Sequence, residues 1–267
     1  MLLFPMRSFR RHAAVSGALA AAAIAASCET VPYTGRSQLQ LMSPAQESQM
    51  GVQAFQQTLA KSQLSGNAVA SEMVTRVGSR IAAVTGHPEY QWEYRLIQDD
   101  KQANAFALPG GKVAVYTGIL PITRDESGLA AVLGHEIGHV VARHGGERVS
   151  QQILVNVGLE TAMASLSAGN PATVQAVASL LGAGATVGVL LPWSRAQESE
   201  ADHLGLILMA KAGYDPHAAR DLWVRMAAAS QGSGRPPEFL STHPSEPTRI
   251  LQIEVWLPEA MQSYRPR

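Results

Sequence analysis

The sequence predicts an α+β fold that is mainly helical, with a small β-sheet beside one central helix. In several long stretches apolar residues recur every three to four positions, which is typical of amphipathic helices. At residues 91–98 the period changes to two, which indicates a half-buried strand. The chain has 267 residues, 46% of them hydrophobic and 16% charged, so it can bury the core of one domain.

Helices are expected where this periodicity is bracketed by capping residues. Ser43 and Pro44 suit the N-cap and the first position of one helix. Thr123 and Glu126 have the spacing of a capping box, and Gly145-Gly146 would end the helix that they begin. Further helices are expected at residues 68–84, after Asp215-Pro216, and near the C-terminus.

Three short strands are expected before the central helix, at residues 91–98, 104–108 and 112–116. Residues 161–194 contain no charged side chain. For this segment we expect a packed or interface-facing helix rather than a membrane-embedded hairpin, because its many Ala and Gly residues are only weakly hydrophobic.

The N-terminus has the composition of a secretory signal peptide. Arginines at positions 7, 10 and 11 precede an uncharged run at residues 13–26, which is too short for a comfortable membrane span. Cys28, the only cysteine, follows as in a bacterial lipobox, and we expect it to be lipidated; a free thiol is the alternative. The expected division is a lipoprotein signal peptide at 1–27, an extended lipidated arm at 28–42 and a folded domain at 43–267.

The stretch LGHEIGHV, residues 133–140, carries the strongest chemical signal. His135 and His139 are four residues apart, so on a helix they share one face and can hold one metal ion. Glu136 lies beside that axis, where it can reach a water molecule on the ion. This is the H-E-x-x-H arrangement of zinc proteases, in which the carboxylate takes a proton from the attacking water. The alternative is two histidines on a helix face, one buried and one solvated.

A second stretch, WSRAQESEADHLG at residues 193–205, supplies candidate partners. Glu198 and Asp202 are four residues apart and share a helix face. One carboxylate could join the two imidazoles as a third ligand and leave a fourth position open, as catalytic zinc requires. The other could accept the free N–H of a ligating imidazole. Glu200 is expected to point away, about 200° around the helix. A solvated acidic face is the alternative.

Three motifs in this order, HEIGH, SRAQESEAD and THPSEPTR, resemble the M48 family of zinc metallopeptidases, which includes HtpX and CAAX-processing proteases. The segments PYTGRSQLQLMS and NAFALPGG resemble its exported bacterial lipoprotein members. The resemblance spans about residues 32–250 and implies a gluzincin-like zincin fold, so that residues 43–267 would be the peptidase domain. It implies one Zn²⁺ per chain, with Glu198 as the third ligand beside His135 and His139, and with Asp202 supporting a ligating imidazole.

The resemblance also implies roles for residues outside the two helices. His243 and Arg249 match a downstream H-P-x-x-x-x-R pattern, and His243 would stabilise the oxyanion of the tetrahedral intermediate or cap the metal at rest. We hypothesise that the loop QGSGRPPE, residues 231–238, lets His243 move between these positions. The family binds substrate as a strand added to a sheet edge. We expect this edge at Lys112, Val113, Ala114 and Val115, with an ordinary core strand as the alternative.

These features predict a zinc-dependent endopeptidase that cleaves misfolded or unassembled envelope proteins. A lipid anchor would hold it in a bacterial membrane, the outer one because Glu29 follows Cys28, facing the periplasm. The alternative function is a chaperone-like assembly factor that holds polypeptides in the same groove with little or latent proteolysis. A purely structural zinc domain is disfavoured, because such sites are closed by four protein ligands, mostly cysteines. Lys plus Arg equals Asp plus Glu at 21 each, which gives no reason to expect nucleic acid. The oligomeric state is left open.

Overall fold

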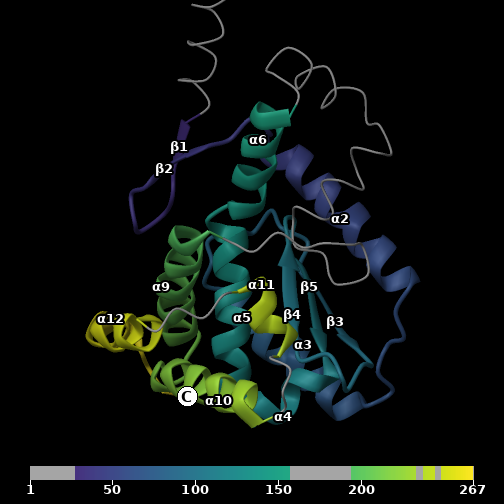
Figure 1. Cartoon of the computed structure of the whole chain (residues 1–267), viewed down its shortest axis with the longest axis vertical. Coiled ribbons are helices and arrows are strands. Elements are labelled where there is room, and N and C mark those ends of the chain that lie inside the picture. The colour runs from purple at the N-terminus through teal and green to yellow at the C-terminus, as the bar shows by residue number, and fades with distance from the viewer. Residues whose placement is uncertain (1–27, 157–193, 233–236, 244–247, 267) are drawn as a thin grey trace, which may run out of the picture.

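The computed structural model describes residues 28–156, 194–232, 237–243 and 248–266. It shows helices packed around a central helix and a small sheet, which confirms the expected α+β class (Figure 1). The expected signal peptide and most of the uncharged segment 161–194 lie outside the described residues. In the part that is described, no helix is both long and apolar enough to cross a membrane.

Helix α5, Glu126–Val141, forms the centre of the molecule. All of its residues from Gly128 onward are buried, because elements on several sides cover it. Its neighbours are α3 (Ala68–Ala82), β4 (Ala105–Leu108), α9 (Arg195–Lys211) and α10 (His217–Gly232). A helix enclosed in this way can bury polar side chains only where other groups pair with them. The buried histidines of α5 therefore indicate a site at which other polar groups pair with them.

The two ends of α5 differ from those expected. Asp125, not Thr123, is the N-cap, and its side chain accepts a hydrogen bond from the backbone N–H of Gly128 at 2.8 Å. Thr123 instead ends the short helix α4, Leu120–Thr123, and Arg124 follows it with a φ of 68°. The capping box predicted at Thr123 and Glu126 is therefore wrong. Arg124, with its positive φ, separates α4 from α5, so Thr123 cannot cap α5.

The C-terminal end of α5 is set by another left-handed residue. The expected stop at Gly145-Gly146 is wrong, since α5 ends at Val141 and Arg143 has a φ of 56°. Helix α6, His144–Asn156, begins at the very next residue and contains both glycines. The chain therefore turns sharply at Arg143.

Strands β3 (Glu93–Ile97), β5 (Lys112–Tyr116) and β4 form a mixed sheet in the order β3-β5-β4. β5 is parallel to β3 and antiparallel to β4, to which a tight turn with two left-handed glycines, Gly110 and Gly111, connects it. The expected substrate-binding strand, Lys112–Val115, thus lies in the centre of the sheet. Both of its edges already pair with neighbours, so it cannot accept an added strand, and that prediction is wrong. β4, which packs against α5, is an edge strand.

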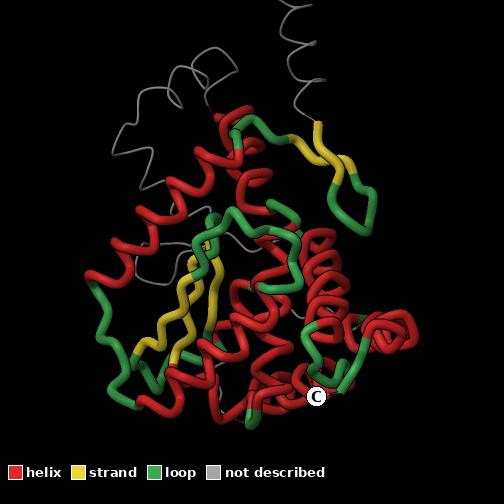
Figure 2. Tube along the Cα trace, turned by 180° about the vertical axis from the view of Figure 1, so that it is seen from behind, coloured by secondary structure: helices red, strands yellow, loops and turns green. Residues whose placement is uncertain are grey.

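Side chains alternate between two cores, one on each face of the sheet. Val113 and Val115 of β5 face the larger core, which is shared with α3 and α5. Ala114 and Tyr116 face a smaller core beneath α2, Pro44–Ala60, where Phe55 is a major contact. Seen from behind, α2 runs beside the sheet on the side away from α9 (Figure 2). The expected N-cap of α2, Ser43 followed by Pro44, is confirmed. Gln46 adds a capping box that was not expected, in which Ser43 and Gln46 cap each other's backbone groups.

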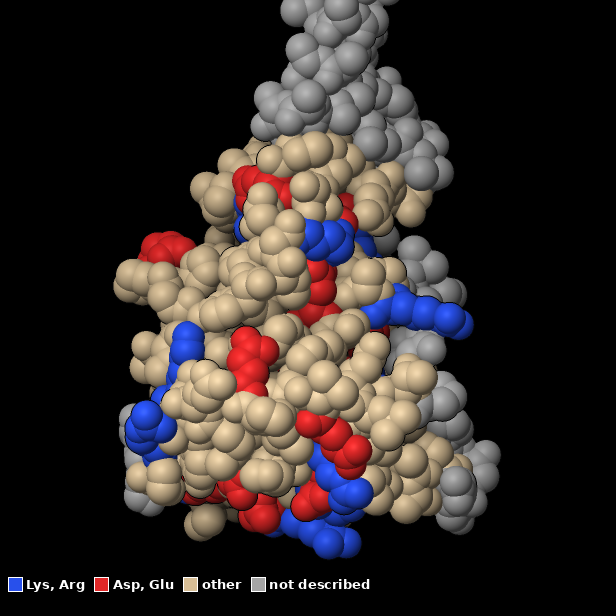
Figure 3. Space-filling model, turned by 90° about the vertical axis from the view of Figure 1, so that its left-hand side faces the viewer, with Lys and Arg blue, Asp and Glu red and all other residues tan. Residues whose placement is uncertain are grey.

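The remaining elements lie at the two ends of the described chain and before α4, and of these the C-terminal helix packs against α9. The arm at residues 28–42 contains a hairpin of β1 (Cys28–Thr30) and β2 (Ser37–Leu39), and Cys28 is exposed. A 3-10 turn, Thr117–Ile119, precedes α4, while α11 (Glu238–Thr242) and α12 (Arg249–Ser263) end the fold. On the face that carries α9 and α12, acidic and basic side chains are interspersed, and neither sign forms a continuous patch there (Figure 3).

A candidate metal centre between two helices

Glycines allow α5 and α9 to touch along their backbones. A Cβ built on Gly134 would lie 2.8 Å from the carbonyl oxygen of Gly205, and one built on Gly205 would lie 2.7 Å from the carbonyl carbon of Gly134. A Cβ on Gly138 would likewise lie 2.9 Å from the carbonyl oxygen of Ala201. Only glycine allows such an approach at these positions. It brings the histidine face of α5 against the acidic face of α9.

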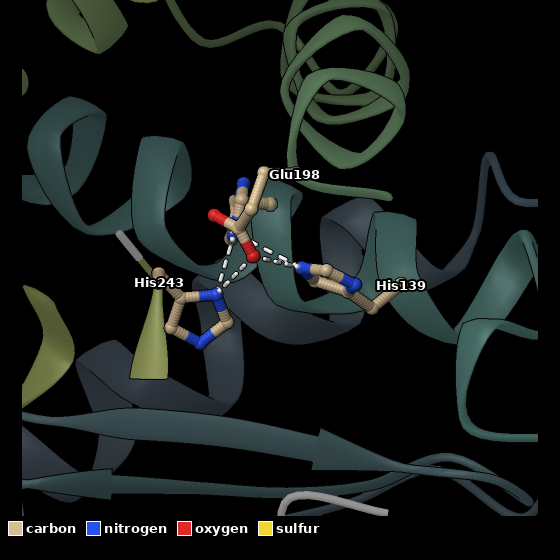
Figure 4. Close-up of side chains that lie close together, drawn as sticks. His139, Glu198 and His243 are labelled. Atoms are coloured by element: carbon tan, nitrogen blue, oxygen red, sulfur yellow. Dashed lines mark hydrogen bonds and ion pairs between the residues drawn. The ribbon is translucent and has the colours of Figure 1, made fainter. Parts of the chain in front are cut away.

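At this contact, four side chains point toward one another (Figure 4). The Nε2 atoms of His135 and His139 are 3.1 Å apart. Glu198 reaches both, with Oε1 at 3.4 Å from His139 Nε2 and Oε2 at 3.7 Å from His135 Nε2. His243 joins from beyond α11, its Nδ1 at 2.9 Å from Glu198 Oε1. One ligand atom from each of the four lies within 4.8 Å of the others, and all four residues are buried.

Asp202 and Arg249 support this cluster from one side. Asp202 Oδ1 lies 2.9 Å from Nδ1 of His135, where it accepts the N–H and leaves Nε2 facing the cluster. Arg249 donates to both acidic residues, at 2.9 Å to Glu198 Oε2 and at 2.6 Å to Asp202 Oδ1. Its guanidinium also stacks 3.5 Å over the ring of Trp223. A buried arginine thus fixes the carboxylates of Glu198 and Asp202, which the sequence pattern alone did not show.

The comparisons with known proteins agree with this geometry. The model of peptidase family M48 matches residues 69–257. A mitochondrial metalloendopeptidase OMA1 of Schizosaccharomyces pombe is 42% identical over 235 residues, which is 87% of this chain and 67% of that protein. The OMA1 protein of Saccharomyces cerevisiae is 36% identical, over 65% of this chain and 49% of its own length. A beta-barrel assembly-enhancing protease of Escherichia coli is 31% identical, over 86% of this chain and 47% of its own length.

The chain belongs to peptidase family M48.

This membership confirms the expected family and metalloendopeptidase class. The M48 chain spans about two thirds of the fission yeast relative and about half of the other two. The expected location, a bacterial outer membrane facing the periplasm, is contradicted by the mitochondrial names of the two yeast relatives. The division at Cys28 and the lipid on that residue stay predictions.

The donor set of the M48 site fits a zinc ion. Two imidazoles and one carboxylate are a set that catalytic zinc sites use, with room for a further ligand. Burial lowers the pKa of both His135 and His139, although Asp202 opposes this at His135 and Glu198 at His139, so both rings are neutral and can ligate. The carboxylate of Glu198 stays ionised despite its burial, because His243 and Arg249 hold its pKa well below the ordinary value.

Glu136 points to the other side of His243, toward β4. Its Oε1 lies 3.2 Å from Nε2 of His243, yet this buried oxygen has no hydrogen-bond partner in suitable geometry. Burial raises the pKa of Glu136 to about 7, although the facing charge of His243 and a hydrogen bond from the backbone of Ala107 oppose the shift. A carboxylate with a pKa near neutrality can both accept and return a proton.

The far side of His139 shows two residues that sequence reasoning missed. Nδ1 of His139 lies 2.9 Å from Nδ1 of His144, and Nε2 of His144 lies 3.1 Å from Oε2 of Glu200. Glu200 points away from the cluster, as expected, but it is buried rather than solvated. The signal that could have shown this is Glu200 itself, an acidic residue on the face of α9 opposite to Glu198.

The hypothesised loop before His243 is only partly described. Residues 233–236 lie outside the described part of the chain, as do residues 244–247 on the other side of His243. His243 itself is described and buried, and its ring stacks on Phe239 at a centroid distance of 4.5 Å.

Proposed function

We propose that this chain is a zinc-dependent endopeptidase in which His135, His139 and Glu198 hold one Zn²⁺. The observation that carries the proposal is the convergence of these three side chains from α5 and α9, with Glu136 beside them. Zinc, when bound, lowers the pKa of a water ligand toward ~7 and polarises a substrate carbonyl.

The surrounding residues have separate tasks in this mechanism. Glu136 takes the proton of the attacking water, since its raised pKa lets it act as a base and then return the proton to the leaving amine. Asp202 and Arg249 keep His135 and Glu198 in place through the contacts described above. His243, charged beside two carboxylates, can either donate to the developing oxyanion or occupy the position beside the ligands at rest.

We further propose that substrate binds as a strand along β4. This edge strand packs against α5, and the backbone of Ala107 within it reaches Glu136. Backbone pairing of this kind selects extended polypeptides with little regard to sequence. Such a strand edge suits misfolded or unassembled proteins, because these expose extended segments that folded proteins hide.

Metal analysis with a protease assay tests the proposal. Purified wild type is expected to carry one zinc per chain and to digest casein, whereas Glu198→Ala loses both. Glu259→Ala is the matched control, since Glu259 is an exposed acid on α12 that pairs with His203, away from the cluster. A wild type that stays zinc-free when zinc is supplied, or zinc retention by Glu198→Ala, contradicts the proposed ligands.

A second candidate function has one supporting observation. The relative from E. coli is named a beta-barrel assembly-enhancing protease, so a chain of this family can be linked to assembly. In this version the chain holds polypeptides along β4 as a chaperone-like factor and rarely cuts them. The two candidates differ in whether the processing of client proteins needs Glu136.

A further inference from the structure

The two zinc-facing imidazoles are supported in different ways. His135 donates directly to a carboxylate, that of Asp202. His139 instead contacts a second imidazole, His144, which in turn contacts Glu200. His144 has no exposed surface, and Glu200 is 7% exposed, so water does not substitute for these partners. The contacts from His139 through His144 to Glu200 have no role in the mechanism proposed above.

Glu200, the last residue in this series of contacts, determines which nitrogen donates in each hydrogen bond. An ionised carboxylate only accepts, so Nε2 of His144 must donate to Glu200. In a neutral imidazole whose single proton is on Nε2, Nδ1 has only a lone pair. That Nδ1 must therefore accept from Nδ1–H of His139. The Nε2 of His139 is left with a lone pair, which faces the ligand cluster.

Glu200 is itself held by the N-terminal arm. Thr34 donates to its Oε1 at 2.6 Å, and Nε of Arg36 donates to its Oε2 at 2.7 Å. The other two guanidinium nitrogens of Arg36 bind Glu147 of α6 at 2.6 and 2.7 Å. Thr34 and Arg36 belong to the turn between β1 and β2, which Figure 1 shows beside α9. They fall within the PYTGR segment, to which the proposed mechanism gives no task.

These partners decide the charge of Glu200. Its two oxygens accept hydrogen bonds from Thr34, from Nε of Arg36 and from His144, and the guanidinium of Arg36 supplies a facing positive charge. These contacts hold the carboxylate in its ionised form. An ionised, immobile acceptor is what fixes the proton on Nε2 of His144.

We propose that His144 and Glu200, held by Thr34 and Arg36 of the β1–β2 turn, are positioning residues that fix the tautomer and orientation of His139 for metal binding. The proposal rests on the proposed function in naming the metal as zinc. It gives the N-terminal arm a direct link to the active site. An event that displaces the arm would therefore weaken the metal centre without touching a ligand.

The first test measures zinc affinity by competition with a chelator, using the full chain. Glu200→Gln keeps the shape but removes the fixed acceptor, and we expect about a 10- to 100-fold weaker zinc affinity, as for other supporting partners of metal ligands. Arg36→Met should have a smaller effect in the same direction. Tyr33→Phe is the matched control: it removes another contact of the same turn, the hydrogen bond from Lys211 to the Tyr33 hydroxyl, and should leave affinity unchanged.

A double-mutant cycle separates positioning from mere stability. If Arg36 acts through Glu200, then Arg36→Met should weaken zinc binding no further in the Glu200→Gln background. If Arg36 only stabilises the fold through Glu147, the two effects add. Additive losses, or losses that follow thermal stability of the zinc-free variants alone, overturn the proposal.

The second test reads the tautomer itself. Nitrogen-15 NMR of histidine-labelled, zinc-free protein should show His139 protonated at Nδ1, with its signals assigned by their loss in His139→Gln. His144→Ala and Glu200→Gln should convert this to a mixture of tautomers. His144→Asn should restore it, because the Asn Oδ1 can accept where Nδ1 of the imidazole did. An unchanged tautomer in His144→Ala overturns the proposal.

These readouts also separate the two proposals. Wild-type protein that shows the fixed tautomer but binds no zinc contradicts the proposed function and leaves the positioning contacts standing. Protein that binds zinc with the same affinity in wild type, Glu200→Gln and His144→Ala contradicts the positioning proposal and leaves the peptidase standing.

Discussion

Nε2 of His135 lies 3.1 Å from Nδ1 of His243, although 108 positions of sequence separate the two residues. The same Nδ1 is 2.9 Å from Glu198, and the opposite ring nitrogen is 3.2 Å from Glu136. The imidazole of His243 therefore stands between the ligand cluster and the general base. In that position it caps the ligands and separates them from the base.

We expect His243→Ala to raise the rate of peptide hydrolysis several-fold and to leave one zinc per chain. The reason is that the ring occupies the space between ligands and base, and alanine clears it. Hydrolysis of a short fluorogenic peptide at saturating zinc measures the rate, and His203→Ala, a histidine paired with Glu259 on the surface, is the control. A loss of about 10²- to 10³-fold would instead assign His243 to the oxyanion, and no change would remove it from the site.

Glu136→Gln should abolish proteolysis while zinc is retained. The amide cannot accept the proton of the attacking water, and general bases contribute about 10²- to 10⁴-fold to rates. The carboxylate of Glu136 is not one of the proposed zinc ligands, whereas that of Glu198 is. Zinc content should therefore stay at one per chain. Casein digestion and metal analysis check both points. If client processing survives in a zinc-loaded Glu136→Gln chain, the holding function replaces the peptidase.

Gly205→Ala should destabilise the protein and weaken zinc binding together. The added methyl would lie 2.7 Å from backbone atoms of Gly134 and His135, which cannot rotate away as a side chain can. Overpacking of this kind costs about 1–3 kcal/mol of unfolding free energy. The forced separation of α5 from α9 would also draw Glu198 from the imidazoles.

Chemical unfolding and zinc titration of the same samples measure both effects. Gly66→Ala is the control, because a Cβ at that position meets nothing within 4 Å. If Gly205→Ala loses stability but binds zinc as the wild type does, the helix contact does not set the ligand geometry.

The sequence predicted the parts of the site that local spacing determines. His135, Glu136 and His139 share a helix, and so do Glu198 and Asp202, so a period of 3.6 residues was enough to place each group on one face. Their meeting could be inferred because a metal needs both groups. The start of α2 was likewise predicted, from Ser43 as N-cap and Pro44 at the first helical position.

The features that the sequence did not predict depend on single backbone angles and on the order of the strands in the sheet. In a continuous helix His144 would stand about 140° from His139 and face elsewhere. The left-handed Arg143 breaks the helix and returns His144 to His139, and no periodicity shows that break. The place of β5 in the sheet was also hidden, because an apolar alternation is the same in a central strand and in an edge strand that is covered by helices.

Glu47 should make the stability of the fold fall as pH rises. This carboxyl is 2% exposed and pairs with Arg143, whose backbone forms the break before His144. Burial raises its pKa from 4.5 to about 7, although Arg143 opposes the shift. Between these values the folded chain keeps a proton that the unfolded chain has released. Raising the pH through this window therefore favours the unfolded state.

Glu47→Gln should flatten this dependence. One pKa unit corresponds to about 1.4 kcal/mol, so the wild type should lose up to about 3 kcal/mol relative to the variant between pH 4.5 and pH 8. Urea unfolding of both proteins at several pH values measures the difference, and the contribution of the metal site cancels because both proteins keep it. If the unfolding free energies of the two proteins change with pH in the same way, Glu47 is ionised throughout. Pairing with Arg143 then lowers the pKa of Glu47 more than burial raises it. In that case replacing the carboxylate would cost stability equally at every pH.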